Sequence, residues 1–163
     1  MSEAALAEAH SYLAGFPGLI TLRHGDLLAA IGSTDKTWDV IFSGFAVHHL
    51  MFDEKVRFLR AAGRCLAENG WLILVDVVRE ESQSRENYLE GYLEFMRENG
   101  IKVPQEQLRE MCAHVHDYDY PECLSILQEM TSAASLNADC IISRYGQHYA
   151  LLFTHSSPPE ICC

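Results

Sequence analysis

Basic residues are scarce in this 163-residue chain. Twelve Lys and Arg stand against 23 Asp and Glu, which gives a net charge of -11. A surface of this sign repels phosphate backbones and anionic lipid headgroups. We therefore expect no nucleic acid and no membrane among its partners, and a small molecule or another protein in their place.

Long apolar runs are missing as well. No stretch of the sequence approaches the roughly 18 consecutive apolar residues that a membrane span needs. Met1–His10 carries neither the basic nor the apolar segment of a signal peptide. We therefore expect a cytoplasmic protein.

Paired cysteine motifs are the third absence. No two of the six cysteines form a Cys-x-x-Cys pair, and four of the six lie in amphipathic or apolar segments, as reduced core thiols do. Neither a zinc site nor a disulfide framework is indicated. The cysteines are Cys65, Cys112, Cys123, Cys140, Cys162 and Cys163.

The most regular part of the sequence is a strand–helix–strand unit. Near-continuous Val, Ile, Leu and Phe in Trp38–Ser43 and Trp71–Val78 predict two strands covered on both faces, as in a parallel sheet. Between them, the segment Asp53–Glu68 has apolar residues at helical spacing on one face and arginines on the opposite face, which predicts an amphipathic helix. Asp53 is its expected N-cap, and a turn at Asn69-Gly70 ends it.

This unit also predicts where a ligand binds. Parallel strands joined by a helix form a β-α-β crossover, and open sheets of this kind bind ligands beyond the carboxyl ends of their strands. The loop Ser43–Leu50 follows the first strand of the unit. We expect the chemistry of the protein there.

Further elements lie on both sides of the unit. Helical spacing and Pro or Gly boundaries predict helices at Ser2–Leu13, Ser84–Asn99, Pro104–Ala113 and from Pro121 onward. The first has Ser2 as its expected N-cap and its apolar residues facing inward, and Asn99-Gly100 is expected to end the second. The predicted strands are Leu19–His24 and a hairpin of Cys140–Ser143 with His148–Phe153. Leu28–Thr37 is expected to form a helical turn and loop, and His114–Tyr120 to be irregular. Together these elements predict one α/β domain over residues 1–155, with a mostly parallel sheet and a C-terminal antiparallel hairpin, and a disordered tail over residues 156–163.

The order of these motifs resembles that of the class I S-adenosylmethionine-dependent methyltransferases, in particular the branch that acts on small molecules. Three segments carry the resemblance. They are Gly25-Asp26-Leu27 after one predicted strand, Ser43–Leu50 with its His48-His49-Leu50 after the next, and the turn Leu66–Gly70. It extends from about Ser2 to Phe153. It implies a partial Rossmann-like fold, S-adenosylmethionine as cofactor and a small-molecule acceptor.

Two hallmarks of that family do not occur in this sequence. The family's first strand ends in a Gly-x-Gly-x-Gly loop and its second in an acidic residue that binds ribose, and neither is found here. Because the family's strand order is 3-2-1-4-5-7-6, their loss leaves Leu19–His24 without a neighbour and Trp38–Ser43 with an open edge. The resemblance thus implies a truncated form with impaired cofactor binding. The alternative is a non-catalytic binding or regulatory module, which pairs through this edge with itself or with an intact relative.

The resemblance also implies which residues contact the cofactor. Asp26 and Leu27 stand where the family binds adenine, although Gly-Asp is also a common turn pair. Ser43, Gly44 and Phe45 stand where backbone carbonyls hold the other end of the cofactor. The alternative for Gly44 is that it only relieves crowding in a tight turn.

His48 and His49 are the candidates for proton chemistry. An imidazole titrates near neutral pH and can take a proton from a hydroxyl or amine as the methyl group moves. Many methyl transfers need little beyond alignment of the reacting groups, so capping or packing roles remain the alternative.

Two other patterns have a structural and a functional interpretation. The run His114-x-His116-Asp117-x-Asp119 offers metal-ligand atoms, but no further ligands follow at a diagnostic spacing, and we predict no metal site. The region Glu80–Tyr120 is expected to enclose the acceptor. Its aromatic residues either line a pocket or form core; they are Tyr88, Tyr92, Phe95 and Tyr118.

Overall fold

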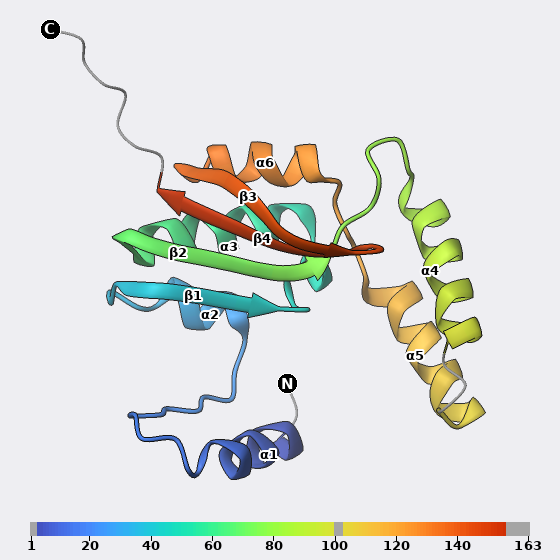
Figure 1. Cartoon of the computed structure of the whole chain (residues 1–163), viewed down its shortest axis with the longest axis horizontal. Coiled ribbons are helices and arrows are strands. Elements are labelled where there is room, and N and C mark those ends of the chain that lie inside the picture. The colour runs from blue at the N-terminus through green and yellow to red at the C-terminus, as the bar shows by residue number, and fades with distance from the viewer. Residues whose placement is uncertain (1–2, 100–102, 156–163) are drawn as a thin grey trace, which may run out of the picture.

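The computed structural model describes residues 3–99 and 103–155 (Figure 1). Its helices are α1 (Glu3–Leu13), α2 (Leu27–Gly32), α3 (Phe52–Cys65), α4 (Arg85–Asn99), α5 (Gln105–Tyr118) and α6 (Leu124–Ser132). A 3-10 turn, η1, covers Val47–His49. The strands are β1 (Trp38–Gly44), β2 (Leu66–Val77), β3 (Leu136–Tyr145) and β4 (His148–His155).

The strands form one sheet in the order β1-β2-β4-β3. β1 and β2 are parallel and joined by α3, whereas β4 pairs antiparallel with both β2 and β3. The predicted crossover and the C-terminal hairpin are both confirmed, and with them the α/β fold class. This order matches strands 4-5-7-6 of the methyltransferase fold.

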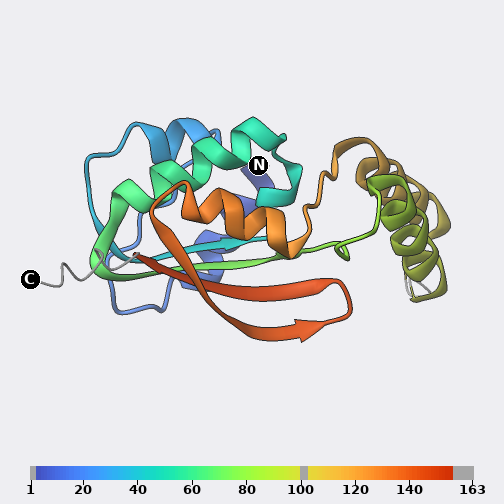
Figure 2. The same ribbon diagram turned by 90° about the horizontal axis from the view of Figure 1, so that it is seen from above.

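The core lies between one face of the sheet and the helices α2, α3 and α6 (Figure 2). Leu72 and Leu74 of β2 point to this face and are almost fully buried, as are Phe58 and Leu59 of α3. Each such side chain stabilises the fold by about 1.5–3 kcal/mol relative to an exposed one. The apolar stripe predicted for the helix therefore packs on the sheet, while Arg57, Arg60 and Arg64 are exposed.

The opposite face of the sheet is bare within residues 3–99 and 103–155, so the prediction that helices cover both faces is wrong. Figure 2 shows α2, α3 and α6 on one side of the strands only. On the other side Val40, Phe42 and Trp71 are 50%, 64% and 53% exposed. Continuous apolar sequence showed that both faces are apolar, but it did not show that this chain covers both.

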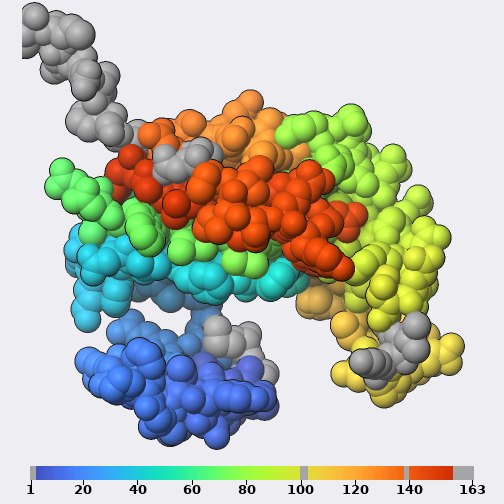
Figure 3. Space-filling model, in the orientation of Figure 1, coloured from blue at the N-terminus to red at the C-terminus, as the bar shows by residue number. Residues whose placement is uncertain are grey.

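The N-terminal part departs furthest from the prediction. Leu19–His24 is not a strand, and Leu19 is 99% exposed. A strand needs a neighbour for its backbone N–H and C=O groups, and no described strand lies beside this segment. The inward face predicted for α1 is wrong as well, because no α1 residue is buried. Figure 3 shows this N-terminal segment as a lobe that stands apart from the sheet.

Several predicted boundaries shift. α3 starts at Phe52, and its cap is not Asp53: Glu54 Oε2 accepts a hydrogen bond from the Met51 N–H at 3.0 Å. The helix ends at Cys65 because the backbone extends at Leu66, whose buried side chain opens β2. Asn69-Gly70 therefore lies inside β2, in the register shift that follows the Trp38–Leu66 pair.

The helices after β2 also differ in length from the prediction. α5 continues through Tyr118, so the segment predicted to be irregular is largely helical; no Gly or Pro interrupts it before Pro121. α6 starts at Leu124 rather than at Pro121. The hairpin is confirmed with longer strands, and Gly146 in its turn has a φ of 58°, which favours glycine.

Some predictions concern residues outside the described ranges. These are the N-cap at Ser2, the helix stop at Gly100 and the tail at residues 156–163. Within residues 3–99 and 103–155, no helix has both the length and the apolar character that crossing a lipid bilayer requires.

Candidate functional site

A pocket lies at the carboxyl ends of β1 and β2, where α4 and α5 pack beyond the end of the sheet (Figure 1). Its volume is about 420 Å³. Its walls come from the loop after β1, the end of β2, α4 and α5, and consist of Phe45, His48, His49, Val77, Tyr92, Met96, Glu110, Met111, His114, Val115 and Asp119. The ligand position predicted for this kind of sheet is therefore a real cavity.

Asp76 holds the first histidine in place. It interrupts the apolar run of β2, and its Oδ2 accepts hydrogen bonds from the N–H groups of Val47 and His48 at 3.0 and 3.1 Å. Its Oδ1 contacts His48 Nδ1. Because a carboxylate can only accept, this contact places the ring proton on Nδ1 and leaves Nε2 of His48 without one.

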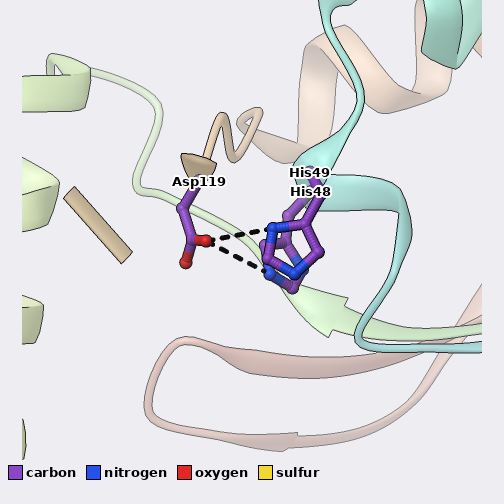
Figure 4. Close-up of side chains that lie close together, drawn as sticks. All are labelled: His48, His49 and Asp119. Carbon is purple, nitrogen blue, oxygen red and sulfur yellow. Dashed lines mark ion pairs between the residues drawn. The ribbon is translucent and has the colours of Figure 1, made fainter. Parts of the chain in front are cut away.

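Asp119 faces both histidines (Figure 4). It follows α5 and is only 2% exposed. Its Oδ1 lies 3.5 Å from His48 Nε2 and 3.2 Å from His49 Nδ1. Neither approach has hydrogen-bond geometry, and this buried oxygen has no hydrogen-bond partner among the described residues. Burial raises the pKa of the Asp119 carboxyl, against the opposing effect of the neighbouring histidines.

His49 is the more accessible histidine, with a side chain 37% exposed. Its Nδ1 donates to the Tyr118 carbonyl at 3.2 Å, because a carbonyl oxygen is only an acceptor. Its ring lies 3.9 Å from that of His48 and 5.3 Å from that of His114, between centroids. In this tautomer Nε2 is the nitrogen that can accept a proton.

A buried lysine fixes the segment that carries Asp119. Lys55 of α3 is 1% exposed and donates to the Tyr120 carbonyl and, at 3.0 Å, to Glu122 Oε1. Burial lowers the pKa of Lys55, although Glu122 opposes this shift. From the other side, Arg85 of α4 donates to the Asp119 carbonyl at 2.7 Å. These bonds hold the carboxylate against the histidines.

The predicted cofactor residues lie apart from this cluster, with one exception. Asp26 Oδ1 accepts the Ala29 N–H at 2.8 Å and caps α2, in line with the turn interpretation, and its cofactor role stays a prediction. Phe45 alone is shared with the pocket. Its φ of 49° is unusual for a bulky residue, and its ring packs edge-on against His148 with centroids 5.6 Å apart.

The described residues fit only part of S-adenosylmethionine. Asp26-Leu27 at the start of α2 offers a carboxylate and backbone groups for the adenine end, and Ser43–Phe45 at the end of β1 offers backbone groups for the other end. No Gly-x-Gly-x-Gly loop occurs in the sequence to approach the methionine half. These residues supply one side of a cofactor site.

The sequence signals for the supporting residues were weak. Asp76 is a charge inside an apolar strand and Lys55 is a lysine next to the apolar stripe of α3, and neither position by itself predicts a role in a site. The sequence groups Asp119 with three other candidate ligands in the run His114–Asp119, and the structure divides this group. His114 and Asp119 face the pocket, whereas His116 and Asp117 form an exposed pair.

The aromatic residues between β2 and β3 are predicted either to line a pocket or to form core, and the structure contains examples of both. Tyr92 lines the pocket, and its hydroxyl lies 3.3 Å from His148 Nε2. Tyr88 is fully buried under it in the core. Phe95 and Tyr118 are partly exposed and are not part of the lining.

Comparison with known proteins finds similarity to methyltransferases in sequence and in fold. The sequence model of a family described as a methyltransferase domain matches residues 1–74. No curated protein matches the chain. Many solved structures do match it.

Three of these structures illustrate the likeness. The mitomycin 7-O-methyltransferase MmcR has a TM-score of 0.64 at 13% identity, over 94% of this chain and 40% of its own. An O-methyltransferase family protein from Burkholderia thailandensis has a TM-score of 0.63 at 14% identity, over 93% of this chain and 40% of its own. PigF with S-adenosylhomocysteine has a TM-score of 0.60 at 16% identity, over 94% of this chain and 46% of its own. At such identities the likeness shows the fold alone, and this chain spans less than half the length of each of the three.

Proposed function

We propose that this chain, which has the fold of the class I S-adenosylmethionine-dependent methyltransferases, forms the acceptor-binding side of an enzyme that methylates a small molecule. The observation that carries the proposal is the pocket at the carboxyl ends of β1 and β2, with His49 in its wall. The domain match and the fold support methyl transfer in general. We further propose a small molecule as the acceptor, a role for each residue of the pocket and a weak affinity of this chain for the cofactor.

The residues of this chain act on the acceptor. Bound S-adenosylmethionine would supply an electrophilic methyl group, and the protein would mainly align the acceptor with it. Tyr92, Met96 and Met111 offer an apolar wall that excludes water from an acceptor in the pocket. Such alignment is the largest contribution that we assign to this chain.

His49 is the proposed base. Its Nδ1 is held by the Tyr118 carbonyl, so Nε2 is available to take the proton that an acceptor hydroxyl or amine loses. The Asp119 carboxylate, 3.2 Å from Nδ1, would stabilise the imidazolium that results. His48 is less suited to this role because it is buried between Asp76 and Asp119.

Methyl transfer should therefore depend on His49. We expect slow formation of S-adenosylhomocysteine from S-adenosylmethionine and a panel of small phenols and amines, and a decrease of about 10²- to 10⁴-fold in the His49→Gln variant. His116→Gln, an exposed histidine on α5, is the matched control and should retain the wild-type rate. Equal rates for His49→Gln and the wild type would exclude the base role.

Cofactor binding is tested separately, by calorimetric titration with S-adenosylhomocysteine. Because the sequence has no glycine-rich loop for the cofactor, we expect a dissociation constant weaker than about 100 μM, which corresponds to less than about 5.5 kcal/mol of binding free energy. Micromolar binding would contradict the impairment that we propose, without contradicting methyl transfer itself.

The second candidate function is a non-catalytic module that pairs with a second copy of the chain. One observation favours it: among the described strands β1 pairs only with β2, so its outer edge is open, and Val40 and Phe42 on it are at least half exposed. Light scattering after size-exclusion chromatography distinguishes the two. A well-folded monomer that turns over substrate would rule this candidate out.

A further inference from the structure

We infer that His48, His49 and Asp119 form a binding site for a divalent transition-metal cation of the Zn²⁺ type. Each residue offers one ligand atom, and the three atoms lie within 4.8 Å of one another. Two imidazoles and a carboxylate are a ligand set typical of Zn²⁺. The sequence predicted no metal site, because the three residues come from two distant segments.

The distances in the cluster suit a metal ion. Ligand atoms at about 2.0–2.1 Å from a tetrahedral Zn²⁺ stand about 3.3 Å apart. Asp119 Oδ1 lies 3.5 Å from His48 Nε2 and 3.2 Å from His49 Nδ1, close to this value. Two edges of the ligand triangle are therefore already near their final length.

The state of Asp119 is a second, independent indication. Its Oδ1 is buried and has no hydrogen-bond partner within the described residues, although two ring nitrogens approach it. A buried, unpaired carboxylate oxygen is costly for the fold. A cation shared with the two rings would satisfy this oxygen without any hydrogen bond.

The surroundings of His48 match those of a metal-binding histidine. Such histidines usually donate their second ring N–H to a carboxylate, which fixes the ring and raises its basicity. Asp76 takes this position, with its Oδ1 on His48 Nδ1 and its Oδ2 on two backbone N–H groups. Nε2 of His48 is thereby directed at Asp119 without a proton, ready to ligate.

His49 completes the site at a small cost. Ligation through Nδ1 would replace its 3.2 Å hydrogen bond to the Tyr118 carbonyl. The fourth position would then open toward the pocket, where water or an oxygen of the acceptor could bind. Ligation by Nδ1 would leave the ring proton of His49 on Nε2, the nitrogen proposed as base, so metal binding and base catalysis would compete, but the metal site does not depend on methyl transfer.

The test is a titration of the metal alone. Cobalt(II) is added to the intact chain, and its visible d–d absorption reports tetrahedral binding; Zn²⁺ is then added to displace it. All proteins carry Cys140→Ser, Cys162→Ser and Cys163→Ser, so that thiolates do not capture the metal. We expect saturation at one Co²⁺ per chain and full displacement by one Zn²⁺.

The variants identify the ligands. Asp119→Asn and His49→Gln should each lose saturable binding, and Asp76→Asn should bind about 10- to 100-fold more weakly. His116→Gln with Asp117→Asn, the exposed neighbouring pair, should bind as the parent does. Circular dichroism tests whether each variant is folded. If Asp119→Asn does not fold, the binding measured for His49→Gln decides whether the cluster is the metal site.

Two results would overturn the inference. The first is no saturable Co²⁺ or Zn²⁺ binding by the parent chain. The second is unchanged affinity in folded Asp119→Asn or His49→Gln. Neither result bears on methyl transfer, since no cofactor or acceptor is present in the titration.

Discussion

Asp76 is a single side chain on which the geometry of the site depends. It accepts hydrogen bonds from the backbone N–H groups of Val47, His48 and Val77, the last at 2.9 Å, and it contacts the His48 ring. All of these groups are buried. Removal of the carboxylate would leave them without partners in a place that water does not reach.

Asp76→Ala should therefore destabilise the fold far more than its size suggests. We expect the free energy of unfolding to fall by roughly 2–4 kcal/mol, because several buried donors lose their acceptor together. Urea denaturation measures this change. Asp39→Ala, an exposed aspartate of β1, is the control and should change the free energy of unfolding by less than about 0.5 kcal/mol.

At the scale of elements, Lys55 ties α3 to the segment between α5 and α6. Its ammonium donates to the Tyr120 carbonyl and to Glu122, and Arg79 lies 3.7 Å from the same carboxylate. The Tyr120 N–H in turn donates to the His48 carbonyl at 2.8 Å. Asp119 is thus positioned by contacts to two elements outside its own helix.

Lys55→Met should break this connection, with a loss of about 3–5 kcal/mol in the free energy of unfolding at pH 7, because Glu122 is left without its closest cation. Burial lowers the pKa of Lys55 from 10.5, so above the folded value the unfolded state binds more protons at this residue. The stability of the wild type relative to Lys55→Met should accordingly rise as the pH approaches 10.5.

Urea denaturation of both proteins at pH 7 and pH 10 measures this difference, and the subtraction cancels the other titrating groups. Arg57→Met on the exposed face of α3 serves as the control. A difference that shrinks between the two pH values would contradict the assigned direction of the Lys55 pKa.

The helices and strands differ in how well the sequence predicts them. Helical spacing is a local property, so α3, α4 and the hairpin were found close to their true positions. Strand pairing is not local: Leu19–His24 has strand-like sequence, yet it is not a strand in the absence of a neighbour. In the site, His48 and His49 were found from their place after a strand, whereas their partners Asp76 and Asp119 come from distant segments that only the fold brings to them.

In the whole molecule as far as it is described, helices cover one face of the sheet and none covers the other, the bare face (Figure 2). Val40 pairs with Trp71 and Phe42 with Ile73, so these four side chains lie together on the bare face. Three of them are at least half exposed. Exposed apolar patches next to an open strand edge are typical sites of association.

Phe42→Lys should therefore reduce association between copies of this chain without unfolding it, because Phe42 is 64% exposed and contributes little to the core. Light scattering over a concentration series measures the mass, and we expect the wild type to exceed the mass of one chain at high concentration while Phe42→Lys does not. Leu19→Lys, which removes an even more exposed apolar side chain away from the sheet, should associate as the wild type does. A wild type that stays monomeric at every concentration would show that the bare face does not bind a second copy.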